Sequence, residues 1–204
     1  TVVIRCVLSM ENALQEMTKM NPQQNNTHDA RYHDMYYMNY DDTLLFKKRM
    51  PTSAMVPYTE FCKNHEHPER VMRLLFNDDD YWKNHLNANK LYEVLFKQAS
   101  NVQSTELRNS MSLYDLFTDD EIYDLWLINN AWWYINYGAC PLNGGNQPYS
   151  QRNLLRKIIS DADSCIALPH PGVTLRYGHD TMVMPLTCLM DLDEMGMQVS
   201  DLEQ

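Results

Sequence analysis

The residues best suited to binding or catalysis lie near the end of the chain, at 175–180 (Leu-Arg-Tyr-Gly-His-Asp). Residues 172–177 predict a strand that ends at Gly178, and the apolar spacing after Asp180 predicts a helix. An imidazole beside a carboxyl group at a helix N-terminus suits anion binding, because free N–H groups and the macrodipole attract negative charge there. Such a pair could bind a phosphate and protonate its leaving group. His179 and Asp180 are therefore candidate catalytic residues.

Helical patterns in the rest of the chain would position these residues. Apolar side chains recur at helical spacing from about Cys6 to Met20, and Asn21-Pro22 should end that helix. Further helices are expected at 58–64, at 68–76, at 88–100 after the cap residue Asn87, in a segment with Pro148 in its first turn, and after His179.

A capping box marks the start of the longest predicted helix. Thr118 and Glu121 have the spacing at which each side chain satisfies a free backbone amide of the first turn. The helix should run to Tyr137 and stop at Gly138. Its apolar residues spread around much of the circumference, so we expect burial on more than one side. Its three tryptophans should lie in the core: Trp126, Trp132 and Trp133.

Strands are expected in few places. The chain has 6 glycines in 204 residues, which favours helices over a turn-rich β architecture. We therefore predict a mainly helical segment with strands at 1–4, 31–40 and 172–177, and a short one at 165–168.

The charge balance limits the classes of partner. The formal net charge is −10, and no stripe of Lys and Arg occurs. Because sequence-independent nucleic-acid binding requires cations that neutralise phosphates, nucleic acid is not an expected partner. No apolar run reaches the roughly 20 residues needed to cross a bilayer, so no membrane span is expected. Any phosphate site in this acidic chain must be local.

Five cysteines without C-x-x-C spacing fit neither a zinc site nor a complete disulfide framework. Cys6, Cys165 and Cys188 stand in apolar surroundings, which indicates buried thiols. One bridge stays open as an alternative, and with it the redox compartment.

Residues 175–186, which read L-R-Y-G-H-D-T-M-V-M-P-L, resemble the C-terminal catalytic motif of the histidine acid phosphatases. The closer likeness is to the branch that contains the multiple inositol polyphosphate phosphatases. Residues 4–9, I-R-C-V-L-S, look like the R-C-x-x-S segment that follows a strand in the same chain order. The resemblance covers nearly the whole chain, but only the middle portion of a complete family member.

The resemblance implies roles for three residues. Arg5 would clamp phosphate with its guanidinium fork, a geometry suited to phosphate oxygens. His179 would hydrogen-bond the phosphoryl oxygens, and Asp180 would protonate the departing alcohol oxygen. Thr181 stands where inositol-phosphate members commonly carry a glutamate as the acid, so the donor arrangement is that of ordinary acid phosphatases. A phosphorylated small molecule is the implied partner, and no metal or organic cofactor is implied.

The nucleophile of the family is absent. It lies in an R-H-G-x-R-x-P motif, and no Arg-His-Gly occurs in these 204 residues. Because that histidine forms a phosphohistidine, the chain alone should have little or no turnover. The chain also opens at Thr1 directly in an apolar run, so we interpret it as an internal piece of such an enzyme. Full-length members are periplasmic or secreted.

The architecture implied by the resemblance is α/β (phosphoglycerate mutase-like), with a helical cap inserted into the core. Residues 1–45 and 166–204 would belong to the core, as the arginine and His-Asp segments, and 46–165 would form the cap. Missing strands would leave open edges and apolar patches, which favours pairing of copies into a homo-oligomer. The alternative is a non-catalytic helical domain that binds a partner or a phosphorylated ligand.

Other polar clusters have structural interpretations. The spacing of His65 and His67 before Pro68 indicates a solvated loop, although both residues could ligate a metal. Gly144-Gly145 lacks the Lys-Ser/Thr of a phosphate loop. Asp78-Asp79-Asp80 is interpreted as an exposed acidic turn. A second cluster could resemble a metal site but is interpreted as structural, because its region resembles a strand near the sheet edge of the family: His28, Asp29, His33 and Asp34.

Overall fold

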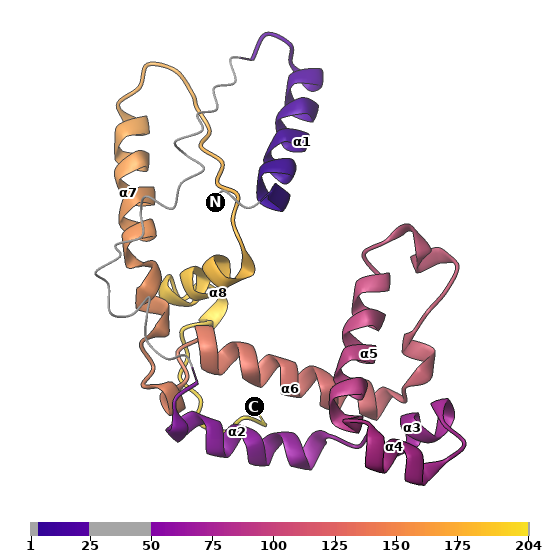
Figure 1. The fold of residues 1–204 in the computed structure, drawn as a ribbon. Helices are drawn as coiled ribbons and strands as arrows, with labels where there is room; N and C mark the ends of the chain where they lie inside the picture. The colour runs from indigo at the N-terminus through magenta and orange to yellow at the C-terminus, as the bar shows by residue number, and fades with distance from the viewer. Residues whose placement is uncertain (1–3, 25–49, 204) are drawn as a thin grey trace. The chain divides into compact units, whose positions relative to one another are not determined.

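The computed structural model describes residues 4–24 and 50–203 (Figure 1). These residues form two compact units. The first unit holds the described residues of 1–49 together with 135–200, and the second holds 50–134 together with 201–203. These units are defined by contacts within the chain, so the predicted division into core segments (1–45 and 166–204) and a cap (46–165) stays a prediction.

The described residues are mainly helical, as predicted, and contain no strand. The strand predicted at 172–177 is therefore wrong, as is the one at 165–168, where helix continues to Ile166. Ile4, in the predicted strand 1–4, begins a helix, whereas 31–40 lies outside the described residues. A strand needs a hydrogen-bonded neighbour, and no described segment supplies one to 172–177. The apolar side chains of that segment consequently lie exposed.

The first unit consists of helices α1 (Ile4–Met20), α7 (Arg152–Ile166) and α8 (Asp180–Leu189), with the 3₁₀ turns η4 (Pro141–Asn143), η5 (Gln147–Gln151) and η6 (Leu192–Glu194) (Figure 1). Helix α1 ends before Asn21-Pro22, as predicted, and α8 follows His179, as predicted. Helix α8 packs against η5 and α7. Pro185 and Cys188 on α8 are buried there, which fixes the helix that follows His179.

A glycine turn joins η4 to η5. Gly144 and Gly145 have φ values of 82° and 68°, a region that residues with a Cβ adopt only with strain. A Cβ at Gly145 would also lie 2.6 Å from Nε2 of Gln198. The side-chain amide of Asn143 donates to the carbonyl of Ile135 at 2.9 Å. Gly144 and Gly145 therefore form the turn between these two 3₁₀ segments.

The second unit consists of α2 (Thr52–His65), α3 (Glu69–Leu75), α4 (Asp79–His85), α5 (Ala88–Val102), η2 (Glu106–Asn109), η3 (Tyr114–Leu116) and most of α6 (Asp119–Tyr137). The last three residues of α6, 135–137, belong to the first unit. Helix α2 begins earlier than the predicted 58–64. Asn87 caps α5 as predicted, because its Oδ1 accepts from the Lys90 amide at 2.9 Å.

Helix α6 contributes to two apolar clusters of the second unit, so the predicted burial on more than one side is confirmed. Leu125 belongs to the first cluster, and Leu127, Ile128 and Ala131 belong to the second. The first cluster also contains Val71, Met72, Trp82, Tyr92, Ala99 and Phe117.

The expectation that the tryptophans of α6 lie in the core is wrong for two of them. Trp126 is 50% exposed and Trp132 is 38% exposed. The Trp126 ring stacks on Tyr123, with the ring centroids 6.0 Å apart. Residues three positions apart share one face of a helix, and this face is turned away from the two clusters. Among the described residues, no helix combines the length and the apolarity that a membrane crossing requires.

Glu121 links the start of α6 to α3. Its Oε2 accepts from the Thr118 amide at 2.8 Å, and the Glu121 amide donates to Oγ1 of Thr118 at 3.3 Å, which confirms the capping box. Arg70 on α3 donates from Nε to Oε1 of Glu121 at 2.9 Å, and from Nη2 to both Glu121 and the Leu116 carbonyl. Burial alone would raise the pKa of Glu121, but these hydrogen bonds lower it.

We predict that Glu121→Gln destabilises the second unit by about 1–3 kcal/mol, because a buried charge-assisted network loses its acceptor. Since the pKa is lowered on folding, this contribution is present above the ordinary carboxyl pKa and disappears as pH falls through the folded value. Urea unfolding at pH 7 and at low pH measures both effects. The matched control is Glu106→Gln, an exposed glutamate of η2. Equal losses in the two variants would contradict the assignment.

Candidate functional site

The structure brings Arg5 and His179 together, although 174 positions separate them in the chain. Arg5 is the second residue of α1, and His179 immediately precedes α8. Nη2 of the Arg5 guanidinium lies 3.3 Å from Nδ1 of the His179 imidazole. In Figure 1 the segment that leads into α8 accordingly passes the first turn of α1. Two helix N-terminal ends therefore meet at the two predicted motifs.

The contact with Arg5 determines which ring nitrogen of His179 carries the proton in the neutral imidazole. A guanidinium has donors and no acceptor, so Arg5 donates and Nδ1 accepts. The neutral ring then carries its proton on Nε2. An Nε2–H group beside guanidinium N–H groups is a set of donors that suits the oxygens of a phosphoryl group.

Cys6 packs against the same imidazole. Its side chain is 6% exposed, and its Sγ donates to the Gly178 carbonyl at 3.4 Å. The same Sγ lies 3.6 Å from Nδ1 and 3.9 Å from Nε2 of His179. Sequence reasoning predicted a buried thiol here but missed its contact, since no local pattern indicates which distant segment a side chain meets. Cys6 is thus a positioning residue for His179.

The remaining cysteines give a mixed outcome. Cys188 is buried, as predicted, whereas Cys165 is exposed, so the prediction of a buried thiol is wrong there. Cys165 is close to the C-terminal end of α7, where the helix has little to pack against. All five thiols are free.

An ion pair outside the site anchors the segment before His179. Arg176 pairs with Asp161 on α7, and Asp161 also pairs with Lys157 of the same helix. The hydrogen bond from Lys157 and the charge of Arg176 lower the pKa of Asp161. The sequence offered no signal for this pair, because the two partners belong to different segments. It restricts the chain that delivers His179 to α1.

Steric crowding does not require a glycine at position 178. A Cβ at Gly178 would meet nothing within 4 Å, so no close approach of another segment makes glycine necessary here. Its contribution is the carbonyl that accepts from Cys6.

Asp180 is the first residue of α8 and is exposed to solvent. Its Oδ1 accepts from the Thr181 amide at 2.8 Å. This hydrogen bond uses one of the free amides of the first helical turn and fixes the carboxyl group next to His179. Solvent access and a fixed position are properties that a general acid requires.

The electrostatic environment of Arg5 favours an anion. Among the described residues, no carboxylate forms an ion pair with Arg5, whose guanidinium is exposed. The N-terminal ends of α1 and α8 each add partial positive charge. Arg5 and His179 thus concentrate hydrogen-bond donors and positive potential in a chain whose net charge is −10.

The histidine clusters noted in the sequence do not form metal sites among the described residues. His65 ends α2 with its side chain 13% exposed and contacts two carboxylates, so the solvated-loop expectation is wrong for it. His67 bonds through Nε2 to the Asn64 carbonyl at 3.0 Å. The described ranges hold no group of three or more His, Cys, Asp or Glu side chains placed to bind a metal ion. The cluster His28, Asp29, His33 and Asp34 lies outside the described residues.

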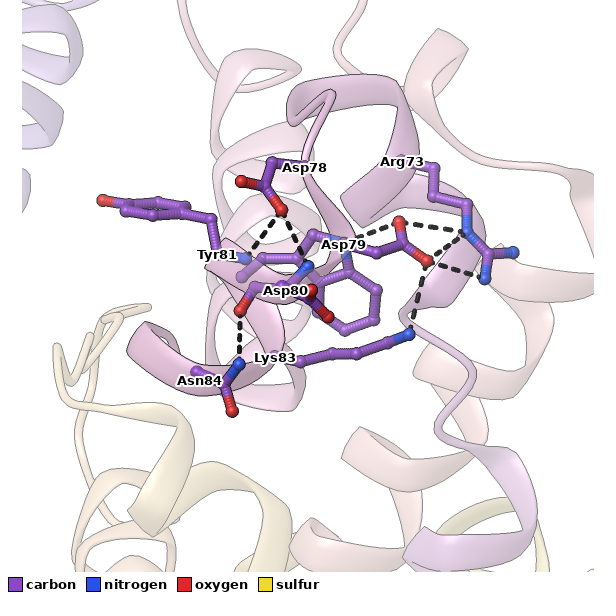
Figure 2. A network of polar contacts seen from close by, with 8 residues as sticks. Arg73, Asp78, Asp79, Asp80, Tyr81, Lys83 and Asn84 are labelled. Atoms are coloured by element: carbon purple, nitrogen blue, oxygen red, sulfur yellow. Dashed lines mark hydrogen bonds and ion pairs between the residues drawn. The ribbon is translucent and has the colours of Figure 1, made fainter.

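The acidic triplet is the capped start of α4 rather than a free turn (Figure 2). Oδ1 of Asp78 accepts from the amides of Asp80 and Tyr81 at 2.9 and 3.1 Å. Asp79 accepts from Arg73 and Lys83, and from the Trp82 indole at 3.2 Å. These hydrogen bonds, led by the one from Arg73, lower the pKa of Asp79 to about 2. The triplet is therefore structural.

A shallow hollow lies along one face of α7. It is lined by Arg156, Ile159, Ser160, Asp163 and Ser164. Because its lining comes from a single helix and includes none of the predicted site residues, it supplies no enclosure for a ligand.

Comparison with protein-family models finds no match to this chain, and comparison with curated proteins finds none either. The geometry of Arg5, His179 and Asp180 and the motifs that carry them are what bears on function.

We predict that Asp79→Asn lowers the melting temperature of the second unit more than Asp80→Asn does, since Asp79 accepts hydrogen bonds from three side chains. Because folding lowers the pKa of Asp79, its contribution is present above pH 3.8 and is lost as pH falls through about 2. Thermal unfolding of both variants between pH 2 and 7 tests this. A pH-independent difference, or none, would contradict it.

Proposed function

We propose that Arg5, His179 and Asp180 form part of a phosphomonoester-binding site of the histidine acid phosphatase type. The observation that carries the proposal is the 3.3 Å approach of Arg5 to His179. The resemblance requires the residues of two distant motifs to share one phosphate, and the geometry is compatible with that requirement. The absence of a described carboxylate partner for Arg5 supports it further.

In the complete enzyme, a histidine from sequence outside these 204 residues would attack phosphorus in line with the departing oxygen. The bond between phosphorus and the alcohol oxygen breaks while a nitrogen–phosphorus bond forms. Arg5 and His179 stabilise the charge on the phosphoryl oxygens. Asp180, in its protonated form, transfers its proton to the alcohol oxygen. Water then hydrolyses the phosphohistidine and releases inorganic phosphate.

The proposal extends to the fold of that enzyme. A phosphoglycerate mutase-like α/β core would require strands next to 172–177 and α1, where apolar side chains lie exposed. Val173 and Ile4 are 76% and 74% exposed. Partner strands from other sequence would cover such residues.

A second candidate function is a non-catalytic helical domain that binds a partner protein or a phosphorylated ligand. The observation that favours it is the same exposure of large apolar side chains in the first unit, which includes Leu8 and Ile166 at 56% and 83%. Apolar surface of this kind marks interaction sites. Pairing of copies of this chain is one form that such binding would take.

We predict that inorganic phosphate raises the melting temperature, because a ligand that binds the folded state stabilises it. For a dissociation constant of about 1 mM, 10 mM phosphate stabilises by about 1.4 kcal/mol, or roughly 2–5 °C in a chain of this size. His179→Ala and Arg5→Ala should abolish the shift. Their matched controls, His170→Ala and Arg156→Ala, alter an exposed histidine and an exposed arginine of the same unit and should retain it.

Equal shifts in all four variants would exclude the site and favour the non-catalytic alternative. The same preparations are incubated with p-nitrophenyl phosphate at acid pH. Little or no release is expected, because the nucleophile is absent from the sequence. Robust metal-independent release by the wild-type chain would refute that part of the proposal.

A further inference from the structure

His65 holds two carboxylates from distant parts of the second unit. Its Nδ1 lies 2.8 Å from Oδ1 of Asp124 on α6, and its Nε2 lies 2.9 Å from Oε1 of Glu203. Its side chain is 13% exposed, and its ring packs on Phe61 with the centroids 4.4 Å apart. The ring is therefore fixed between a helix and the segment 201–203.

Residues 201–203 have few other attachments to this unit. Leu202 packs against the cluster formed by Phe61, Leu127, Ile128 and Ala131. Oδ1 of Asp201 accepts from the Glu203 amide at 3.0 Å, a bond within the segment itself. Residues 201–203 are thus attached to this unit by the hydrogen bond between His65 and Glu203 and by the apolar contact of Leu202.

The protonation state of the imidazole determines whether both bonds exist. Ionised carboxylates accept hydrogen bonds and donate none, and a neutral imidazole has one donor nitrogen. Two N–H···O⁻ bonds to two carboxylates therefore require the imidazolium form. When the ring loses a proton, one nitrogen becomes an acceptor that faces a carboxylate, and that bond is replaced by repulsion.

We propose that His65 is a proton-controlled latch that fastens residues 201–203 to α2 and α6 and releases them when the ring becomes neutral. The bond to Glu203 is the one that breaks. Glu203 is 55% exposed and lies on a short segment, whereas Asp124 is 26% exposed and belongs to a helix. Water can replace the ring as the partner of Glu203 at low cost, and the segment can move.

The charges that face His65 set the pH range of the latch. Burial lowers the pKa of His65, but the hydrogen bonds and charges of Asp124 and Glu203 outweigh burial and raise it. The neighbouring Glu66 bonds to Asn89 on α5, and Lys63 pairs with Glu60 on α2. The latch is therefore fully closed below the ordinary histidine pKa of 6.5 and opens as pH rises through the raised folded value.

The latch acts where the chain returns to the second unit, at residue 201. The chain leaves the second unit after Tyr134 and re-enters it at Asp201. Release of 201–203 removes that re-entry and uncovers the part of the apolar cluster that Leu202 contacts. Acidic pH thus keeps residues 201–203 attached to the second unit, and neutral to alkaline pH releases them.

Backbone ¹⁵N relaxation of the full chain at pH 5.5 and 8.5 tests the latch. In the wild type, order parameters of residues 201–203 should fall from about 0.8 to below about 0.6 as pH rises. Glu203→Gln, an exposed substitution that leaves the core intact, should give low values at both pH values. Glu60→Gln, an exposed carboxylate of α2 that pairs with Lys63, should behave as the wild type.

Imidazole ¹⁵N spectra supply the second measurement. Both ring nitrogens of His65 should carry protons at pH 5.5, and one should lose its proton in the same pH range in which 201–203 become mobile. Order parameters that stay constant from pH 5.5 to 8.5, or a Glu203→Gln variant as ordered at pH 5.5 as the wild type, would overturn the proposal.

Discussion

The contact between Arg5 and His179 is the constraint on which the functional account depends. Arg5 is a permanent cation, and the imidazole accepts one of its hydrogen bonds at 3.3 Å. No described carboxylate neutralises this arginine. Positive charge at the ends of two helices, with donors directed to one place, is stabilised when an anion binds between them. This contact is therefore the basis of the phosphate site proposed for this acidic chain.

The second unit shows how this chain treats charges that have structural roles. Glu121 accepts from Arg70 and from the capping amide of Thr118, and Asp79 accepts from Arg73, Lys83 and an indole. Each of these carboxylates is satisfied by cations of its own unit, and each has a lowered pKa. Arg5 differs in that its described partner is an imidazole. This contrast supports the proposal that Arg5 binds a ligand, whereas Arg70, Arg73 and Lys83 hold helices together.

Local rules predicted the elements that depend on local interactions. The caps at Asn87 and Thr118, the stop at Gly138 and the helix after His179 follow from hydrogen bonds within a few residues, and all are confirmed. The strand at 172–177 failed because a strand depends on a neighbour, and Trp126 failed because composition does not tell which face is covered. The partners of Cys6, His65 and Arg176 lie in distant segments, and so no sequence spacing indicated them.

Crystals of the chain soaked in sodium tungstate, a heavy analogue of phosphate, test the central claim most directly. The account predicts an anomalous difference peak within hydrogen-bonding distance of the Arg5 guanidinium and of Nε2 of His179. The peak should be lost in crystals of His179→Ala. A structure in which these two side chains lie apart, or in which tungstate binds elsewhere and leaves them unoccupied, would contradict it.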